Sequence, residues 1–146
     1  MLIRSMEESD LEEVYAIEQD TFSDPWSKED FQNVLRDENN EYLVVILEGH
    51  VIGYCGYWGV AGEGDVYNVA VKHDHRGQKI GYLMLSELLN IAKSRGITAL
   101  TLEVRSSNES AIRLYRSLGF EQTAIRKDFY TKPKEDAIIM WLHDIQ

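Results

Sequence analysis

One stretch of the sequence, Val66 to Gly81 (VYNVAVKHDHRGQKIG), constrains the fold more than any other. It begins with an apolar, β-branched segment that is typical of a buried strand. A short polar turn with Arg76 and Gly77 follows, and Ile80 opens a helical pattern that continues to about Arg95. A strand, a glycine-containing loop and a helix start bring free backbone N–H groups and the positive end of a helix to one point. The stretch therefore predicts a phosphate-binding loop, with an ordinary surface turn as the alternative.

The chain before this stretch predicts two helices and three strands. The strand segments are rich in apolar and β-branched residues, and they span residues 2–6, 42–47 and 51–60. Ser9-Asp10-Leu11-Glu12 matches a capping box that opens a helix to about Asp20. Pro25 interrupts the chain, and Ser27 is placed to cap a second helix through Leu35 or Arg36. With residues 66–71, the two longer strands predict an antiparallel meander.

The chain after this stretch predicts a parallel crossover and a closing strand pair. The helix from Ile80 ends at Gly96, and residues 97–104 form a strand that should lie parallel to residues 66–71. Ser107 or Asn108 caps a helix that ends before Gly119. The last strands are predicted for residues 120–130 and 137–142, with Pro133 in their connection. The order of elements predicts one α+β domain over residues 1–146.

Charge and composition restrict the class of partner. The 25 acidic and 15 basic residues give a net charge of −10, which disfavours a protein that binds a nucleic-acid backbone. An acidic surface suits a cationic partner, such as a protonated amine or a basic polypeptide, although solubilising charge is the alternative. No apolar run approaches the roughly 20 residues that span a bilayer, and the N-terminus lacks the pattern of a signal peptide. With the single Cys55, these features predict a cytoplasmic protein that binds neither membrane nor nucleic acid.

Two sets of motifs resemble a known family. Arg76-Gly77-Gln78-Lys79-Ile80-Gly81 is similar to the coenzyme A pyrophosphate loop, Arg/Gln-x-x-Gly-x-Gly/Ala, of the GCN-five-related N-acetyltransferases. Within that superfamily, further segments resemble the RimI-type ribosomal-protein-alanine N-acetyltransferases: Pro25-Trp26-Ser27, Leu102 to Phe120, Phe129-Tyr130, Glu135-Asp136-Ala137 and Met140. The resemblance covers nearly the whole chain. It implies a GNAT-like α+β fold, in which a mixed, mostly antiparallel central sheet with flanking helices contains a βαβ acetyl-CoA-binding core.

The resemblance implies acetyl-CoA as co-substrate and no metal. The expected cofactor contacts are Val69, Ala70, Val71, Arg76, Gly77, Gln78, Lys79, Ile80, Gly81, Tyr82 and Asn108. The backbone of residues 69–71 would pair with the pantetheine arm, and one of its N–H groups would polarise the thioester carbonyl. Lys79 departs from the family, which usually has glycine there. A left-handed conformation would cost lysine about 1 kcal/mol, and we expect an ordinary helical φ because the position lies at the helix start.

Two residues are candidates for acid–base chemistry. Strand alternation places Glu103 with Thr101 and Arg105 on one face, and a carboxylate in a central strand must be paired or line a cleft. The resemblance makes Glu103 the general base, acting through a water, whereas a solvated glutamate is the alternative. It also makes Tyr115 the proton donor to the departing sulfur, with a core tyrosine as the alternative. Because a tyrosine near pKa 10 is a weaker acid than a thiol near 8.5, full transfer is uphill by about 2 kcal/mol. Tyr115 would then mainly stabilise the thiolate by hydrogen bonding.

The acceptor side is predicted from three aromatic residues. In the family, the segments that contain Trp26, Phe129 and Tyr130 hold the acceptor peptide, and plain packing is the alternative for each. The resemblance implies direct acetyl transfer to the N-terminal amine of a basic, small-subunit ribosomal protein that begins with alanine. An α-amine near pKa 7.8 costs about 1 kcal/mol to deprotonate at neutral pH, against about 4.6 kcal/mol for lysine. Acetylation of lysine side chains or small amines, or a non-catalytic acyl-CoA-binding module, are the competing interpretations.

Overall fold

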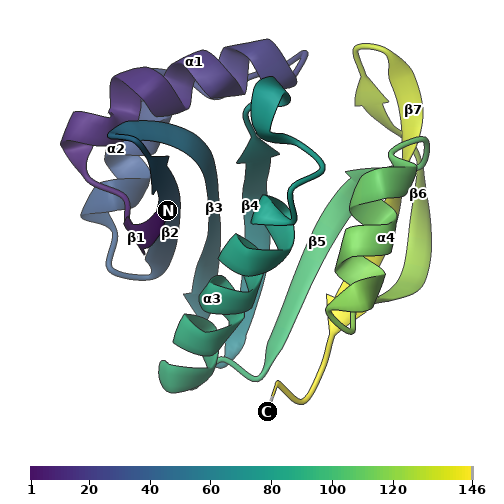
Figure 1. Ribbon diagram of the computed structural model, residues 1–146. Coiled ribbons are helices and arrows are strands. Elements are labelled where there is room, and N and C mark those ends of the chain that lie inside the picture. Colours follow the sequence, from purple (N-terminus) through teal and green to yellow (C-terminus); the bar gives the residue numbers. More distant parts are fainter. Residues whose placement is uncertain (146) are drawn as a thin grey trace.

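Seven strands form one sheet in the order β1-β2-β3-β4-β5-β7-β6 in the computed structural model, which describes residues 1–145 (Figure 1). The strands are β1 (Leu2–Ser5), β2 (Asn40–Leu47), β3 (His50–Val60), β4 (Glu63–Val71), β5 (Ala99–Arg105), β6 (Glu121–Thr131) and β7 (Lys134–Leu142). Only the β4–β5 pair is parallel, and the other neighbours are antiparallel. The predicted α+β class, with its antiparallel meander and parallel crossover, is therefore confirmed.

Helices cover both faces of this sheet. They are α1 (Leu11–Thr21), α2 (Lys28–Arg36), α3 (Ile80–Ser94) and α4 (Glu109–Ser117), with 3-10 turns at Glu8–Asp10 and His73–His75. One apolar cluster joins α3 and α4 to the sheet, and a second joins α1 and α2 to the opposite face. Alternation along β2 divides the two clusters, because Leu43 and Val45 belong to the first and Tyr42 and Val44 to the second. None of the helices in residues 1–145 is long and apolar enough to cross a membrane.

The sheet opens between its two central strands. β5 pairs with residues 63–65 of β4 and not with residues 66–71, so the predicted direction of pairing is right and the predicted partners are wrong. The reason lies in a β-bulge, because Val66 pairs with Tyr57 and Asn68 pairs with Gly56 on β3, which leaves Tyr67 as the extra residue. A bulge bends its strand and increases the local twist. Figure 1 shows β4 and β5 diverging beyond their paired ends.

Two of the boundaries that differ from the predictions have a clear structural cause. Ser9 does not cap α1, because Asp10 receives the backbone N–H of Glu7 at 2.8 Å and residues 8–10 form a 3-10 turn. Asp10 is preferred because its carboxylate also accepts two bonds from Arg4, at 2.8 and 2.9 Å. β7 begins at Lys134, three residues before the predicted start, because the hairpin turn is confined to residues 132–133. The predicted Ser27 cap of α2 is confirmed by a 3.1 Å bond from the Asp30 N–H.

Candidate active site

The loop between β4 and α3 leaves a run of backbone donors free. The first bond into α3 runs from the Leu83 N–H to the Lys79 carbonyl at 3.1 Å. In the part of the chain that the structure describes, the N–H groups of residues 77–82 have no hydrogen-bond partner. Gly77 has φ +80° and open space where a Cβ would stand. Unpaired N–H groups at a helix start, beside a glycine that permits close approach, fit a diphosphate.

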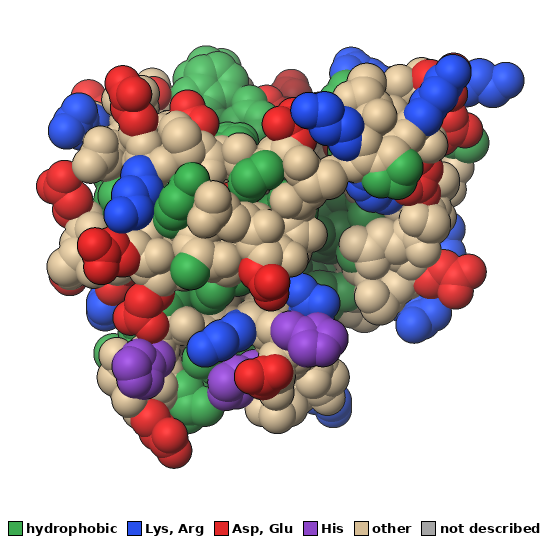
Figure 2. Space-filling model, turned by 90° about the horizontal axis from the view of Figure 1, so that it is seen from above, with side chains coloured by type: hydrophobic (Ala, Val, Ile, Leu, Met, Phe, Trp, Pro, Cys, Tyr) green, Lys and Arg blue, Asp and Glu red, His purple; other side chains and the backbone are tan. Residues whose placement is uncertain are grey.

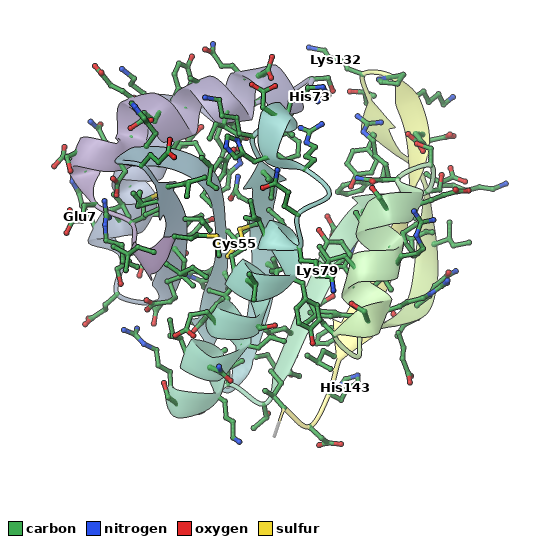
Figure 3. The ribbon with its side chains drawn as sticks, in the orientation of Figure 1. Glu7, Cys55, His73, Lys79, Lys132 and His143 are labelled. Carbon is green, nitrogen blue, oxygen red and sulfur yellow. The ribbon has the colours of Figure 1, made fainter. Side chains whose placement is uncertain are left out.

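Lys79 corrects the prediction of an ordinary helical backbone. Its φ of 62° and ψ of 16° are left-handed, and it is the residue that precedes the first residue of α3 (Figure 3). The chain enters the helix through a turn in which both Gly77 and Lys79 have positive φ. For lysine this conformation costs about 1 kcal/mol. The family's usual glycine would avoid that cost, and lysine adds an exposed cation at the helix start.

Arg76 and Gly81 brace the loop from its two ends. The Arg76 Nε donates to the Val71 carbonyl at 3.0 Å, and its Nη1 lies 3.4 Å from Nδ1 of His73. Arg76 also lines a hollow of about 460 Å³ with Asp20, Lys72, His73 and Asp74. A Cβ on Gly81 would stand 3.1 Å from Leu114, so this glycine lets α3 approach α4 closely. Tyr82 and Gln78 are exposed beside it.

The divergence of β4 and β5 creates the second part of the site. Beyond Asp65, β4 has no hydrogen-bonded strand on its β5 side within residues 1–145. This unpaired edge contains the half-buried Val69 and Val71 and the buried Ala70. Viewed from above, the molecule is hollowed beside the β6–β7 hairpin (Figure 2). An extended ligand arm can pair with this strand edge as a missing strand would.

Glu103 lies on β5 and points to the face of the sheet that α1 and α2 cover. The burial pattern of β5 alternates as predicted, with Leu102 and Val104 buried and Glu103 exposed. Oε1 of Glu103 lies 3.6 Å from Nη1 of Arg126, and the two side chains are 39% and 61% exposed. An ion pair so exposed contributes about 0–1 kcal/mol. The carboxylate is therefore paired, as predicted, and remains accessible to water and to a ligand.

Tyr115 lies on the opposite side of the opening, where α4 packs against the sheet. It is buried, and burial raises the pKa of its phenol, with Cys55 and Tyr130 raising it further. Its hydroxyl makes no hydrogen bond in the described chain. This hydroxyl oxygen is nevertheless in contact with solvent, because the one fully buried side-chain polar atom without a partner among the described residues is Nδ1 of His75. The raised pKa keeps Tyr115 protonated and makes full proton transfer to sulfur less favourable than for a free tyrosine.

Tyr130 connects these two candidates. Burial raises its pKa, and the carboxylate of Glu103 raises it further. Because Tyr130 is also one cause of the raised pKa of Tyr115, it lies within electrostatic reach of both. Asn108 begins the helix of Tyr115, and its Oδ1 caps α4 by accepting the Ala111 N–H at 3.3 Å. Of the two predicted caps, Ser107 and Asn108, the structure shows Asn108, and a role for its amide toward a ligand stays a prediction.

The aromatic residues predicted for the acceptor come from two sides. The ring centroid of Trp26 lies 5.3 Å from that of Phe31 and 6.2 Å from that of Tyr67. Phe129 and Tyr130 pack edge to face, with their ring centroids 5.1 Å apart. Phe129 is 41% exposed, whereas Trp26 is half-buried. Packing therefore accounts for much of the Trp26 surface and for less of the Phe129 surface.

Arg105, which sequence reasoning missed, joins those two sides. Its guanidinium stacks 4.2 Å from the Tyr130 ring and donates to the Pro133 carbonyl at 2.9 Å and the Lys132 carbonyl at 3.1 Å. It also reaches the Ser23 hydroxyl at 3.4 Å, and Ser23 bonds to the Lys132 carbonyl. These contacts tie the α1–α2 loop to the tip of the β6–β7 hairpin, where Figure 3 labels Lys132. They bound the open end of the sheet.

Glu18 was also missed, although its buried carboxylate accepts hydrogen bonds from three different residues. It is 2% exposed and accepts bonds from the Tyr54 hydroxyl at 2.6 Å, the Trp26 N–H at 3.0 Å and the Asn68 amide at 3.3 Å. Asn68 in turn accepts the Tyr42 hydroxyl at 2.7 Å. One carboxylate thus joins α1, the α1–α2 loop, β3 and the bulge in β4. The available signal was an acidic residue at the helical spacing of the buried stripe of α1.

Two other kinds of chemistry find little support in the geometry. Cys55 is fully buried beneath α3, and burial raises the pKa of its thiol, so it is not an activated nucleophile. In residues 1–145 no three His, Cys, Asp or Glu side chains are grouped so that they could hold a metal ion. The available hydrogen-bond donors fit an acyl coenzyme A instead. Free N–H groups lie at the start of α3, and the unpaired edge of β4 lies next to them.

The fold and the site define an acetyl-coenzyme A-dependent N-acetyltransferase. Residues 11–120 match the model of the Acetyltransferase (GNAT) family, and the chain belongs to this family. It is 38% identical over 144 residues to the Escherichia coli K12 [Ribosomal protein bS18]-alanine N-acetyltransferase, with 96% of this chain and 95% of that protein covered.

Solved structures agree with this assignment. The crystal structure of the ribosomal-protein-S18-alanine N-acetyltransferase from Escherichia coli superposes with a TM-score of 0.91 at 36% identity, covering 99% of this chain and 94% of that one. The ribosomal-protein-alanine N-acetyltransferase from Brucella melitensis gives 0.87 at 27% identity, with 98% and 99% covered. The resemblance predicted from the sequence motifs is confirmed.

Proposed function

We propose that this chain transfers acetyl from acetyl-CoA to the N-terminal α-amine of ribosomal protein bS18, which begins with alanine, in the cytoplasm. The relatives that cover nearly the whole chain are named for this reaction. The observation that carries the proposal is the opening between β4 and β5. Through this opening, the donor-rich edge of β4 and the β4–α3 loop are connected to the opposite face of the sheet, which contains the accessible carboxylate of Glu103.

The chain holds the co-substrate mainly through its backbone. Acetyl-CoA, when bound, supplies the acetyl group as a thioester. The N–H groups of residues 77–82 bind the diphosphate at the start of α3, and Arg76 and Lys79 add positive charge. The edge of β4 at Val69, Ala70 and Val71 orients the pantetheine arm. One N–H of this edge is aimed at the developing oxyanion, where such a donor contributes roughly 3 kcal/mol.

Proton handling falls to Glu103 and Tyr115. Glu103 accepts one proton of the ammonium group through a water, and the neutral amine nitrogen then forms the new bond to carbon as the carbon–sulfur bond breaks. The nitrogen gives up its second proton to water as the amide forms. Tyr115 donates a hydrogen bond to the departing sulfur. Because its pKa is raised, the proton that finally neutralises the thiolate comes from solvent more easily than from the phenol.

The acceptor lies between the α1–α2 loop and the β6–β7 hairpin. Trp26 and Tyr67 bound it on one side, and Phe129 and Tyr130 on the other. Arg105 holds the two sides together at the open end of the sheet. An N-terminal amine reaches Glu103 from the α1 and α2 face, while the co-substrate occupies the opposite face.

The test is acetylation of defined amines. The protein is incubated with acetyl-CoA and a peptide that carries the bS18 N-terminus, the same peptide with a blocked N-terminus, a lysine peptide and a polyamine. Mass spectrometry is expected to find one acetyl group on the α-amine of the first peptide and none on the second. Faster acetylation of the lysine peptide or the polyamine would replace the proposed acceptor. Binding of acetyl-CoA without any turnover would favour an acyl-CoA-binding module.

A further inference from the structure

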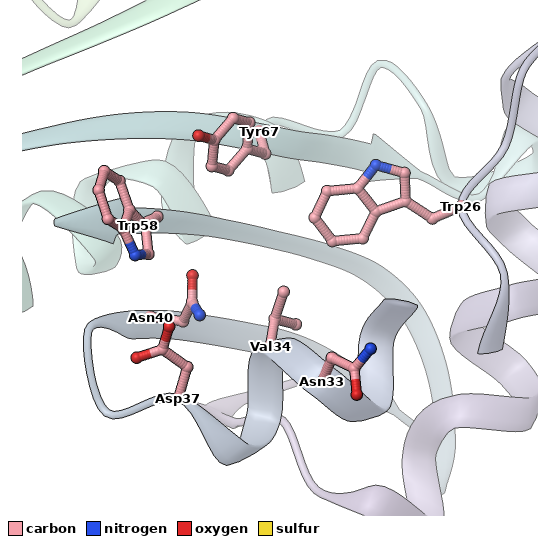
Figure 4. A pocket seen from close by; sticks show the side chains of 7 residues that line it. All are labelled: Trp26, Asn33, Val34, Asp37, Asn40, Trp58 and Tyr67. Carbon is pink, nitrogen blue, oxygen red and sulfur yellow. The ribbon is translucent and has the colours of Figure 1, made fainter. Parts of the chain in front are cut away.

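A groove adjoins the proposed acceptor site and extends beyond the groups used by the reaction described above. It has a volume of about 340 Å³ and is lined by Trp26, Asn33, Val34, Asp37, Asn40, Trp58 and Tyr67. Figure 4 shows Trp26, Tyr67 and Trp58 along one side, and Asn33, Val34, Asp37 and Asn40 along the other. Because Trp26 and Tyr67 also bound the proposed acceptor site, the groove continues that site across β4 and β3.

The groove presents aromatic surface to solvent. Tyr67 is 54% exposed and Trp58 is 36% exposed. The bulge in β4 makes Tyr67 the unpaired residue of its strand, which places its ring above the sheet beside Trp26, with the two ring centroids 6.2 Å apart. Aromatic faces in this arrangement attract a cationic group.

Two carboxylates accompany these rings. Asp65 lies directly opposite Trp58 in the β3–β4 register, and its Oδ2 is 3.5 Å from the Tyr67 hydroxyl. Asp65 thus stands beside the groove, whereas Asp37 lines the groove itself, and the Asp37 carboxylate accepts the Asn39 N–H at 2.9 Å. Among the described residues, no Lys, Arg or His side chain forms an ion pair with either carboxylate, and none lines the groove. The groove thus combines negative charge with aromatic faces and contains no cation of its own.

We propose that this groove binds the side chain of an arginine or lysine that follows the acetylated N-terminus of the acceptor by a few residues. The inference rests on the proposed function and adds a specificity subsite to it. The guanidinium or ammonium group stacks on Trp58 and Tyr67 and is neutralised by Asp37 and Asp65. The chain's net charge of −10 is consistent with a basic acceptor.

The strand register limits which positions of the acceptor can reach the groove. Asp65 pairs with Thr101, which precedes Glu103 by two residues on β5, and Trp58 lies one strand further on β3. Strands about 4.8 Å apart and a rise of about 3.3 Å per residue place Trp58 roughly 12 Å from Glu103. An extended peptide covers this distance in about four residues. The subsite should therefore read one position between the second and the fifth.

The experiment is an arginine scan. Peptides that begin with alanine and continue with glycine and serine carry one arginine at positions two to five, each paired with a peptide that has neutral, nearly isosteric citrulline there. For the wild type, we expect kcat/KM to favour arginine about tenfold at one position, through KM. In the double variant Asp37→Asn with Asp65→Asn, that ratio should fall to about twofold or less. Trp58→Leu should lower it in the same direction.

A matched double variant separates local from overall charge. Glu48→Gln with Glu121→Gln removes two exposed acids that form no ion pair in residues 1–145, and it should keep the tenfold ratio. An arginine preference that is equal in the wild type and in the Asp37, Asp65 variant overturns the subsite alone. Loss of the preference in the matched variant also overturns it, because distant charge would then be the cause. If no alanine peptide is acetylated, the proposed function fails and the subsite fails with it.

Discussion

The two faces of the sheet present different kinds of groups to the proposed ligands. On the side of α3 and α4, the site consists mainly of backbone groups: the free N–H groups of residues 77–82 and the unpaired edge of β4. On the side of α1 and α2, side chains define the site, with Glu18 buried beneath and Trp26, Tyr67 and Glu103 nearer the surface. The bulge and the opening between β4 and β5 connect the two faces.

Because of this difference, substitutions should have different effects on the two faces. A main-chain site depends on local conformation, so it tolerates many side chains and is damaged by a change that alters φ. A side-chain site depends on segments that are distant in the sequence, and single substitutions can alter its shape or charge. Substitutions on the α3 and α4 face should therefore act on acetyl-CoA, and those on the opposite face on the amine.

The largest expected effect follows from Glu103→Gln. The amide cannot accept a proton, so kcat should fall by about 10²–10⁴-fold, while the Kd for acetyl-CoA changes less than threefold. Steady-state rates and calorimetry on the same preparation measure the two quantities. Arg126→Gln is the matched control, because it removes the ion-pair partner and keeps the base. A rate within threefold of the wild type for Glu103→Gln would remove this residue from proton transfer.

The next largest effect is on stability, from Glu18→Leu. Leucine fills similar space but leaves the Tyr54 hydroxyl, the Asn68 amide and the Trp26 N–H without their acceptor. Because each buried unpaired group costs about 1–3 kcal/mol, we expect a net loss of roughly 2–4 kcal/mol in the free energy of unfolding by urea.

Glu12→Leu is the control for that substitution. The Glu12 side chain is 88% exposed on the same helix, and its pair with Lys28 spans 3.8 Å. It should change the free energy of unfolding by less than about 0.5 kcal/mol. Equal losses in the two variants would mean that the network around Glu18 does not stabilise the acceptor face.

A smaller effect distinguishes the phosphate loop from an ordinary turn. Gly77 and Gly49 have φ of +80° and +81°, and a Cβ on either would meet nothing within 4 Å. Gly77→Ala and Gly49→Ala should therefore cost the same stability, about 1–2 kcal/mol. Only Gly77→Ala should also weaken acetyl-CoA binding, by at least fivefold in calorimetry, because its Cβ enters the space for the diphosphate. If the two variants bind acetyl-CoA equally, the loop does not hold the diphosphate.

The smallest effect is a pH dependence at the junction of β7 and α4. Hydrogen bonds from Ser107, then from Arg105 and Ser106, lower the pKa of Glu135 from 4.5 to about 2. Because the folded state has the lower pKa, this stabilisation is fully present above about pH 4.5 and is lost as the pH falls towards 2. The Tm difference between the wild type and Glu135→Gln should therefore shrink over this range. A difference that stays constant from pH 6 to pH 3 would contradict this assignment.

The two faces also differ in how far the sequence predicts them. The backbone face was largely predictable, because Arg76, Gly77 and the apolar run before them are contiguous and form one strand, loop and helix. One error, the left-handed Lys79, arose because nothing local reveals how the turn enters the helix. A second error, the pairing of β5 with residues 66–71, arose because the sequence does not show the bulge in β4. The acceptor face was predicted only in part. Glu18 and Asn68 are 50 residues apart, and their contact requires the bulge in β4.

The central claim is that co-substrate and acceptor occupy opposite faces of one opening in the sheet. Amide and indole NMR spectra of the ¹⁵N-labelled protein, recorded with coenzyme A alone and with acceptor peptide alone, test it most directly. Coenzyme A should shift the amides of residues 77–82 and 69–71, and the peptide should shift the indole signals of Trp26 and Trp58. Peptide-induced shifts concentrated at residues 77–82, or coenzyme A that leaves those amides unchanged, would contradict the claim.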